Sequence, residues 1–351
     1  MQKINIANHF ISKRSPVFII AEAGVNHNGS LDMALQLVNA AADAGADAVK
    51  FQTFKAEEVV TAAGKIADYQ KKNLGIAQSQ LDMLKKLELP EKYYQAIIAR
   101  CKKRNIIFLS TPHGGFASVD FLQRLDVAAF KLGSGDLTNL PLLAYAARFK
   151  KPMILGTGMA TLSEVKKAVR CIKKTGNNQL VILHATTSYP CSERDVNLRA
   201  MQSLMKTADV LVGYSDHTLG VHVPIMAVTL GACVIEKHLT LNTTLPGPDH
   251  SASLQADEFK NMVQAIRQVP IILGSTVKEP TKSEKITLKQ ARKSLVSVTA
   301  IQAGETFTSE NLGIKRPGTG LAPNYYFKVL GKKAKRTVQP GVLISTKDYG
   351  R

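Results

Sequence analysis

The 351-residue chain carries 46 Lys and Arg residues against 27 Asp and Glu, which gives a formal net charge of +19, and 45% of its residues are hydrophobic. No apolar run approaches the ~20 residues of a membrane span, and the N-terminal segment lacks the apolar block of a secretion signal. We therefore expect a cytoplasmic protein. Its four cysteines are far apart and form no CxxC pair, which argues against disulfides and against a cysteine zinc site.

The positive charge does not have the pattern of a nucleic-acid interface. Lys and Arg occur as scattered doublets such as Lys85-Lys86 and Lys166-Lys167, usually late in helix-like segments, where they complement the helix dipole. Aromatic residues make up only 6% of the chain and Trp is absent, so platforms for stacking bases are not expected. The doublets have the pattern of solvated helix faces, and an anionic surface and an anionic substrate remain the alternatives to nucleic acid.

Short β-rich apolar runs, each followed by a longer amphipathic stretch, recur through the first ~270 residues. Helical patterns at 31–44, 91–104 and 163–174 separate these runs. Eight βα units in ~250 residues predict a (β/α)8 TIM barrel. The predicted strands cover residues 17–22, 48–52, 106–111, 128–133, 152–157, 180–185, 210–215 and 233–238.

Two regions depart from the βα repeat. The segment between Thr53 and Leu89 is longer than a usual βα loop and carries Tyr69, Gln70, Asn73 and Gln80, so it is either a substrate lid or a surface excursion. After residue 280 short strands with turns replace the repeat, and segments 300–312 and 337–349 echo each other. We predict a barrel domain over 1–275, a linker over 276–289 and a small, pseudo-duplicated β-rich domain over 290–351.

Side-chain alternation along the strands places two lysines in the mouth of the barrel. Lys50 and Gln52 lie between apolar residues that must cover the helices, so both point inward. Lys131, on the fourth strand, does the same. Two ammonium groups would be costly to desolvate unless an anion met them. Hydroxyl donors at nearby strand ends complete a predicted phosphate or carboxylate site, and these are Thr111, Ser134 and Ser215.

The seventh and eighth strands end in His217 and His238, and neighbouring strands in a barrel let these imidazoles converge. Two imidazoles with open positions suit an exchangeable divalent cation. Glu22 ends the first strand, which closes the barrel beside the eighth, and it would act as a base or contact the water of the metal. The alternative is that each histidine is a structural hydrogen-bonding group.

These residues lie in stretches that resemble the sialic acid synthases and their legionaminic and pseudaminic acid relatives. The resemblance covers nearly the whole chain, and its motifs are specific as a set although each is weak alone. The C-terminal part resembles the antifreeze-like (SAF) domain of that family, a β-clip fold. The matching stretches are IIAEAGVNHNG (19–29), VKFQT (49–53), FLSTP (108–112), FKLGSG (130–135), GYSDHT (213–218), EKHLT (236–240), PGPD (246–249) and KRPG (315–318).

The resemblance implies a role for each residue of the mouth. Phosphoenolpyruvate would be held by Lys50, Thr111, Lys131, Ser134 and Ser215, with Glu22, His217 and His238 as catalytic residues. His217 and His238 would bind the metal, for which Mn²⁺ is expected, with Mg²⁺ and Co²⁺ as alternatives. The amino sugar would be held by Glu22, Gln52, Asp136, Tyr189 and Asp249. Arg316 would reach the N-acyl group from the partner subunit of a domain-swapped homodimer.

The implied reaction joins phosphoenolpyruvate, an N-acylated amino sugar and water into a nonulosonic acid and phosphate. N-Acetylmannosamine is the first choice of acceptor and a 2,4-diacetamido-2,4,6-trideoxy sugar the second. The sequence does not discriminate between them, because Asp136 stands where some sialic acid synthases have Glu and Thr187 where several have Asn. A condensing synthase for a phosphorylated sugar is a further enzyme alternative. A non-catalytic binder of polysaccharide or ice would have no use for the residues of the mouth.

Overall fold

The computed structural model describes residues 2–61, 64 and 79–350, in two compact units, 1–274 and 275–351. Tyr69, Gln70 and Asn73 of the expected lid lie outside the described residues. Within the described part of the chain, no helix has both the length and the apolarity to cross a membrane.

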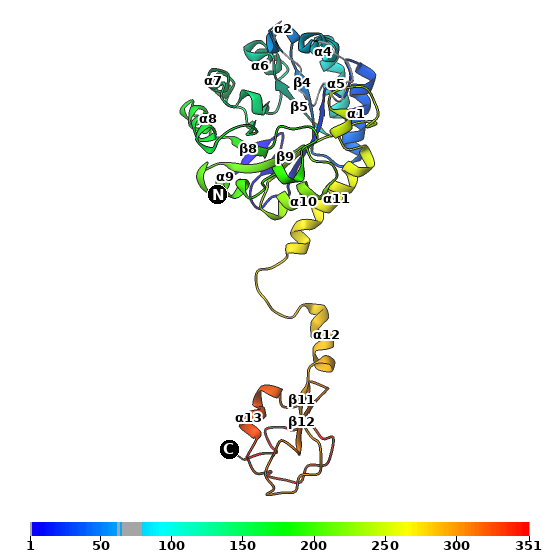
Figure 1. The fold of residues 1–351 in the computed structure, drawn as a ribbon, viewed down its shortest axis with the longest axis vertical. Coiled ribbons are helices and arrows are strands. Elements are labelled where there is room, and N and C mark those ends of the chain that lie inside the picture. The colour runs from blue at the N-terminus through cyan, green and yellow to red at the C-terminus, as the bar shows by residue number, and fades with distance from the viewer. Residues whose placement is uncertain (1, 62–63, 65–78, 351) are drawn as a thin grey trace. The chain divides into compact units, whose positions relative to one another are not determined.

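The larger unit is built on eight parallel strands in the order β5-β4-β3-β10-β9-β8-β7-β6 (Figure 1). The two strands at the ends of this order, β5 and β6, also lie against each other, so the sheet curls into the predicted barrel. Every predicted strand is present with small shifts at its ends. The observed strands are β3 (Phe18–Gly24), β4 (Ala48–Thr53), β5 (Ile107–Pro112), β6 (Phe130–Leu132), β7 (Met153–Gly156), β8 (Leu180–Ala185), β9 (Leu211–Asp216) and β10 (Val234–His238).

A helix follows each strand and covers the outside of the barrel. Local signals fix where these helices begin: Ser30 caps α1, and Thr161 with Glu164 forms a capping box on α8. Within its described residues, the connection between β4 and α5 contains two further α-helices, α2 (Ala56–Val59) and α4 (Gln80–Leu87). The covering helices are α1 (Leu31–Asp43), α5 (Tyr94–Lys103), α6 (Gly115–Arg124), α7 (Leu140–Arg148), α8 (Leu162–Lys174), α9 (Ala200–Thr207), α10 (His222–Thr229) and α11 (Ala256–Leu273).

Side-chain alternation divides the apolar residues of the barrel into two cores. Outward-facing residues such as Phe51 and Phe130 pack against the helices. Inward-facing residues such as Ile20 and Ile154 fill the end of the barrel where the strands begin. A hairpin that the sequence did not lead us to expect, β1 (Ile4–Ile6) with β2 (His9–Ile11), adds three buried isoleucines to this inner core. The other end of the barrel is therefore left to polar side chains.

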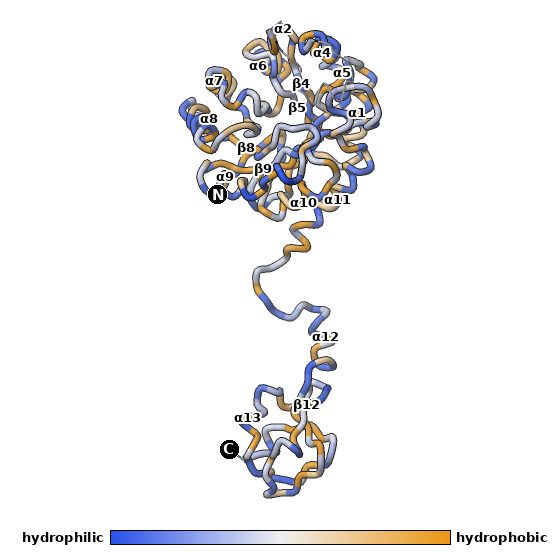
Figure 2. The backbone as a smooth tube through the Cα atoms, viewed as in Figure 1, coloured by the Kyte–Doolittle hydropathy of each residue, from blue (hydrophilic) through white to orange (hydrophobic). Residues whose placement is uncertain are grey.

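The smaller unit contains α12 (Lys282–Ala291), an antiparallel pair of β11 (Ser294–Ser297) and β12 (Leu312–Lys315), and α13 (Tyr326–Val329). Its own core includes Leu295, Phe307 and Ile344. Segments 300–312 and 337–349, which echo each other in sequence, meet at an antiparallel bridge between Ile301 and Val338. Hydrophobic and hydrophilic stretches alternate along the chain of this unit (Figure 2).

Candidate active site

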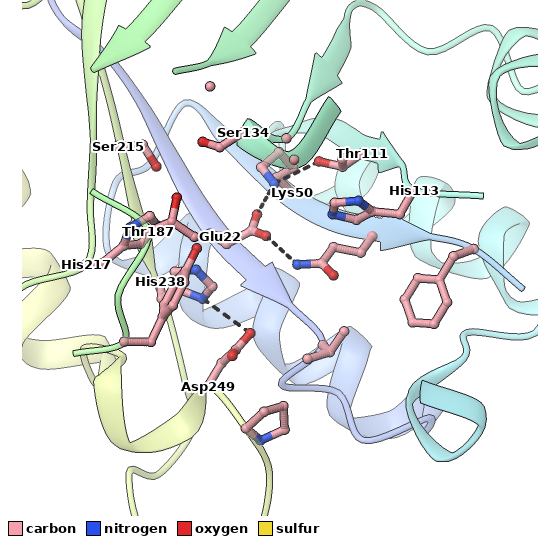
Figure 3. Close-up of a pocket in the computed structure, with 18 of the residues that line it drawn as sticks. Glu22, Lys50, Thr111, His113, Ser134, Thr187, Ser215, His217, His238 and Asp249 are labelled. Carbon is pink, nitrogen blue, oxygen red and sulfur yellow. Dashed lines mark hydrogen bonds and ion pairs between the residues drawn. The ribbon is translucent and has the colours of Figure 1, made fainter. Parts of the chain in front are cut away.

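A pocket of about 400 Å³ opens where the barrel strands end (Figure 3). Polar residues from β3, β4, β5, β9 and β10 and from the loops after β6 and β8 converge on it. Eleven of the predicted site residues line the pocket, and these are Glu22, Lys50, Gln52, Thr111, Lys131, Ser134, Tyr189, Ser215, His217, His238 and Asp249. The predicted convergence of these side chains is therefore observed, whereas their individual roles stay predictions.

Two predicted residues lie elsewhere. Asp136 is not among the pocket-lining residues; it follows Gly135 at the rim, with its Oδ2 3.8 Å from Nδ1 of His113, which does line the pocket. Asp136 is the last residue of a short 3-10 helix, Ser134–Asp136, that follows β6. Arg316 belongs to the smaller unit, beside a cis peptide bond to Pro317.

Lys50 and Lys131 are buried in the mouth, with 2% and 4% of their surfaces exposed. Lys50 Nζ lies 2.5 Å from Glu22 Oε2 and donates a hydrogen bond to Thr111 Oγ1 at 3.0 Å (Figure 3). Lys131 Nζ lies 3.2 Å from Glu236 Oε1. Burial lowers the pKa of Lys131 more than the Glu236 carboxylate raises it, so the charge of Lys131 depends on its anionic neighbours.

Glu236 connects the lysines and is a site residue that our sequence analysis did not select. Besides Lys131, its carboxylate lies 3.9 Å from Lys50 Nζ and accepts a hydrogen bond from Ser215 Oγ at 2.9 Å. Burial raises the pKa of Glu236, but Lys131 and Lys50 together outweigh burial and hold the pKa at about 2. The alternation that selected Lys131 also puts Glu236 and His238 on one face of β10, so the signal was present in the sequence.

The two histidines face each other, with ring centroids 5.6 Å apart. His217 Nδ1 lies 2.7 Å from the Thr186 carbonyl oxygen, which can only accept, so Nδ1 carries the proton and Nε2 has a free lone pair. Burial lowers the pKa of both His217 and His238, so both imidazoles are neutral near pH 7. The Tyr189 ring packs against both, with its centroid 4.1 Å from that of His217 and 5.6 Å from that of His238.

These neutral imidazoles have the donor chemistry of metal ligands. Nδ1 of His238 is buried and has no hydrogen-bond partner among the described residues, and Asp249 Oδ2 lies 3.9 Å from it. Over the same residues, no three His, Cys, Asp or Glu side chains come together as a closed metal cage. The pair therefore fits an exchangeable cation that keeps open positions for other ligands, and does not fit a caged structural ion.

Glu22 is held at the centre of the pocket by a local irregularity of β3. The register between β3 and β4 shifts between Glu22 and Gly24, and Gly24 has a φ of 52°, which favours glycine. A side chain at Gly24 would also crowd Glu22 Oε1, 3.2 Å from the position of a Cβ. Gln52 Nε2 donates to Glu22 Oε1 at 3.3 Å. Burial raises the pKa of Glu22, although Lys50 opposes this effect. A carboxylate with a raised pKa takes up a proton more readily, so Glu22 is suited to act as a base.

The opposite side of the pocket is apolar and comes from the long β4–α5 connection. Gln80, Met83, Leu84 and Leu87 of α4 all line the pocket, and their spacing places them on one face of the helix. Met83, Leu84 and Leu87 form, with Val25 and Phe54, a small hydrophobic cluster separate from the barrel cores. The described part of the connection, including Gln80 of the expected lid, thus contributes to the mouth.

Comparisons with known proteins agree with this architecture. The NeuB family matches residues 37–278, and the SAF domain matches residues 292–349. The N,N'-diacetyllegionaminic acid synthase of Campylobacter jejuni is 47% identical over 93% of this chain and 98% of its own length. The corresponding synthase of Legionella pneumophila is 45% identical over 93% of both chains.

Solved structures give the same result. The spore coat polysaccharide biosynthesis protein SpsE of Bacillus subtilis superimposes with a TM-score of 0.68 at 36% identity, covering 100% of this chain and 99% of its own. The N-acetylneuraminic acid synthetase of Leptospira borgpetersenii, in complex with citrate, gives a TM-score of 0.71 at 35% identity, covering 81% of this chain and 94% of its own. The chain therefore belongs to the NeuB family, the sialic acid synthase family that its motifs resemble, and has a TIM barrel followed by a SAF domain.

Proposed function

We propose that this protein condenses phosphoenolpyruvate with an unphosphorylated N-acylated amino sugar and water, giving a nonulosonic acid and inorganic phosphate. The observation that carries the proposal is the convergence of two buried lysines on one pocket beside two neutral histidines. Buried ammonium groups with hydroxyl donors around them suit a small, multiply charged anion. The names of the similar proteins support a nonulosonic acid product.

For the acceptor we place 2,4-diacetamido-2,4,6-trideoxymannose ahead of N-acetylmannosamine, reversing the order that the sequence alone suggested. Two N,N'-diacetyllegionaminic acid synthases are 47% and 45% identical to this chain, whereas the mouse N-acetylneuraminate-9-phosphate synthase is 33% identical. The pocket also argues against a phosphorylated acceptor. Among its described lining residues, Lys50 and Lys131 are the Lys and Arg side chains, and both lie where phosphoenolpyruvate is expected.

The side chains of the pocket fit the steps of such a reaction. Lys50 and Lys131 would hold the phosphoenolpyruvate anion while its C3 forms a bond to the aldehyde carbon of the open-chain sugar, whose oxygen takes up a proton. Water then adds to C2, and Glu22 is placed to accept its proton. As the C2–O–P linkage breaks and the keto group forms, the same lysines and the hydroxyls of Thr111, Ser134 and Ser215 stabilise the departing phosphate.

We further propose that His217 and His238 hold a divalent cation, Mn²⁺ first. Bound there, it would supply Lewis acidity toward the aldehyde oxygen. Chelation should abolish phosphate release, and added Mn²⁺, Co²⁺ or Mg²⁺ should restore it. His217→Ala should raise the metal concentration that half-restores activity by about 10- to 100-fold. Full turnover in excess chelator, with metal shown to be absent by elemental analysis, would contradict the proposal.

We propose a homodimer in which Arg316 serves the pocket of the partner subunit. The support is that Arg316 sits in a compact unit distinct from the barrel that holds the pocket. Mixing inactive Arg316→Ala and Lys50→Ala subunits under exchange conditions should restore about a quarter of wild-type activity, because random pairing gives each heterodimer one intact site. If mass spectrometry shows exchange and no activity returns, Arg316 does not act from the partner.

The reaction itself is tested by incubating purified enzyme with phosphoenolpyruvate, Mn²⁺ and a panel of free and phosphorylated amino sugars. We expect phosphate release with the free N-acylated sugars, accompanied by a product of the mass of the condensed acid. Release with a phosphorylated sugar only, or with none of the panel, would overturn the proposed function.

A further inference from the structure

The pocket has two chemically different halves. One half contains the ion-paired lysines, Ser215 and Glu236, and Lys50 and Glu236 are 2% and 4% exposed. The other half is an apolar wall, which we define as Val25, Phe54, Met83, Leu84 and Leu87. Such a division suits two reactants of opposite character, an anion on one side and a partly apolar molecule on the other.

Polar contacts behind the apolar wall hold it in place. Lys85 Nζ of α4 lies 2.9 Å from Glu57 Oε1 of α2, and Glu88 accepts a hydrogen bond from the Ala56 backbone N–H at 2.7 Å. Ser79 caps the first turn of α4 by accepting from Asp82 N at 3.1 Å. With α4 fixed at both ends, Met83 and Leu87, one turn apart, present a continuous apolar surface to the pocket.

We infer that the apolar wall selects acceptors that carry a methyl group where common hexosamines carry a hydroxymethyl group. This inference rests on the proposed function and identifies the part of the pocket that would favour a 6-deoxy acceptor. A hydroxyl pressed against Met83, Leu84 and Leu87 would lose its hydrogen bonds to water and find no partner in these side chains. A methyl group there loses nothing and removes apolar surface from water.

The expected selectivity is moderate. An apolar pocket rejects an added hydroxyl by a factor of about 10 to 100, far less than a hydrogen-bonding site rejects the loss of a hydroxyl. The apolar wall should therefore lower the catalytic efficiency for the hydroxylated sugar without excluding it. Its residues are uncharged and make no contribution to the charge of the lysine half, so the affinity for phosphoenolpyruvate should change little when they are substituted.

The test uses two acceptors that differ at one atom, N-acetylmannosamine and its 6-deoxy analogue. Wild-type enzyme should show a kcat/KM about 10- to 100-fold higher for the 6-deoxy sugar. Met83→Gln keeps the length of the side chain and supplies a hydrogen-bonding partner, so it should reduce that ratio about tenfold and leave the KM for phosphoenolpyruvate within about twofold. Met226→Gln is the matched control, since Met226 is exposed on α10.

Leu84→Gln provides a second variant at a half-buried position, in case Met83→Gln fails to fold. Equal use of the two sugars by wild-type enzyme would overturn the inference and leave the condensation reaction standing. A wild-type preference that both Leu84→Gln and Met83→Gln leave unchanged would also overturn it, because selectivity would then come from elsewhere. Failure of every acceptor to release phosphate would instead contradict the proposed function.

Discussion

Two neighbouring residues of β10 enter buried ion pairs of different kinds. Lys237 and Asp216 are both completely buried, 2.5 Å apart, and Lys237 also donates to the Thr218 carbonyl oxygen at 2.5 Å. Asp216 accepts further hydrogen bonds from the Tyr214 hydroxyl and from Thr218. This pair, on the outward side of the strand, uses its donors and acceptors within the barrel wall.

Glu236, the preceding residue, faces the pocket. Its Oε2 accepts no hydrogen bond from the described residues, and the same is true of the Thr187 hydroxyl and of His238 Nδ1, which also line the pocket. Here Lys50 and Lys131 share the carboxylates of Glu22 and Glu236. Burial raises the pKa of Glu22 and lowers that of Lys131, whereas the two lysines lower the pKa of Glu236. A saturated ion pair thus holds the fold, whereas an unsaturated cluster keeps polar atoms available to a ligand.

The largest effect should follow from breaking the saturated pair. Lys237→Met leaves the buried Asp216 carboxylate without its cation, so we expect a loss of about 3 to 5 kcal/mol in the free energy of unfolding. Urea denaturation followed by circular dichroism measures this loss. Lys260→Met, at an exposed position of α11, is the control and should stay within about 0.5 kcal/mol of wild type. Equal stability of the two variants would remove the structural role of the pair.

Lys131→Met should have the opposite profile. We expect the affinity for phosphoenolpyruvate to fall about 100-fold, since one charge-assisted contact in a water-poor pocket is lost. Stability should change by only about 1 kcal/mol, because Glu236 keeps Lys50 and Ser215 as neighbours and Glu22, whose pKa burial already raises, can take up a proton. Isothermal titration calorimetry and urea denaturation on one preparation measure both quantities. Unchanged affinity would show that the lysines do not form the anion site.

Much of this arrangement follows from local sequence pattern. The eight strands were predictable because short apolar runs alternate with amphipathic helices, and Lys50 and Lys131 were predictable because each lies between residues that must face the helices. The roles implied for these residues by the family resemblance are not decided by their positions. Thus the location of the anion site was readable from the sequence and its ligand remains a proposal.

Other features depend on contacts that a linear pattern does not encode. The hairpin of β1 and β2 has only three residues in each strand, too few for a periodic signal. The apolar wall requires knowing that α4 packs back over the mouth. Asp136 was expected in the pocket, but the turn after β6 leaves it at the rim. Glu236 was missed because the sequence analysis did not assign the consecutive charged residues Glu236 and Lys237 to opposite faces of β10.

His27 has a buried polar atom without a partner among the described residues, although it does not line the pocket. Its Nδ1 accepts from Gly29 N–H at 3.0 Å and its Nε2 has no partner among the described residues. Burial, followed by the effect of His250, lowers the pKa of His27 from 6.5 to about 4. Between these values the unfolded chain binds a proton that the folded chain does not, so stability contributed by His27 is complete above pH 6.5 and falls with decreasing pH.

From pH 7 to pH 5 this one group should cost about 2 kcal/mol of unfolding free energy. Denaturant titrations of wild type and His27→Gln across that range measure the slope rather than the absolute stability, so a uniform loss of packing in the variant does not affect the result. The slope should be shallower in His27→Gln. Identical slopes would show that His27 takes up its proton in the folded state as easily as in the unfolded chain.

Glu236→Gln gives the smallest expected change and the sharpest test of the unsaturated cluster. The amide keeps the shape of the side chain and can still accept from Ser215, but it removes the negative charge that opposes the effect of burial on Lys131. The pKa of Lys131 should therefore fall further, and phosphoenolpyruvate affinity should be lost as pH rises, beginning at a lower pH than in wild type. Binding titrations of wild type and variant at increasing pH measure this shift, and we expect about tenfold weaker binding by the variant at a pH where wild-type affinity is still undiminished, since a neutral Lys131 loses its charge-assisted contact. If the two pH profiles are parallel, Glu236 does not maintain the charge of Lys131, and the cluster differs from the Lys237–Asp216 pair only in its exposure to the pocket.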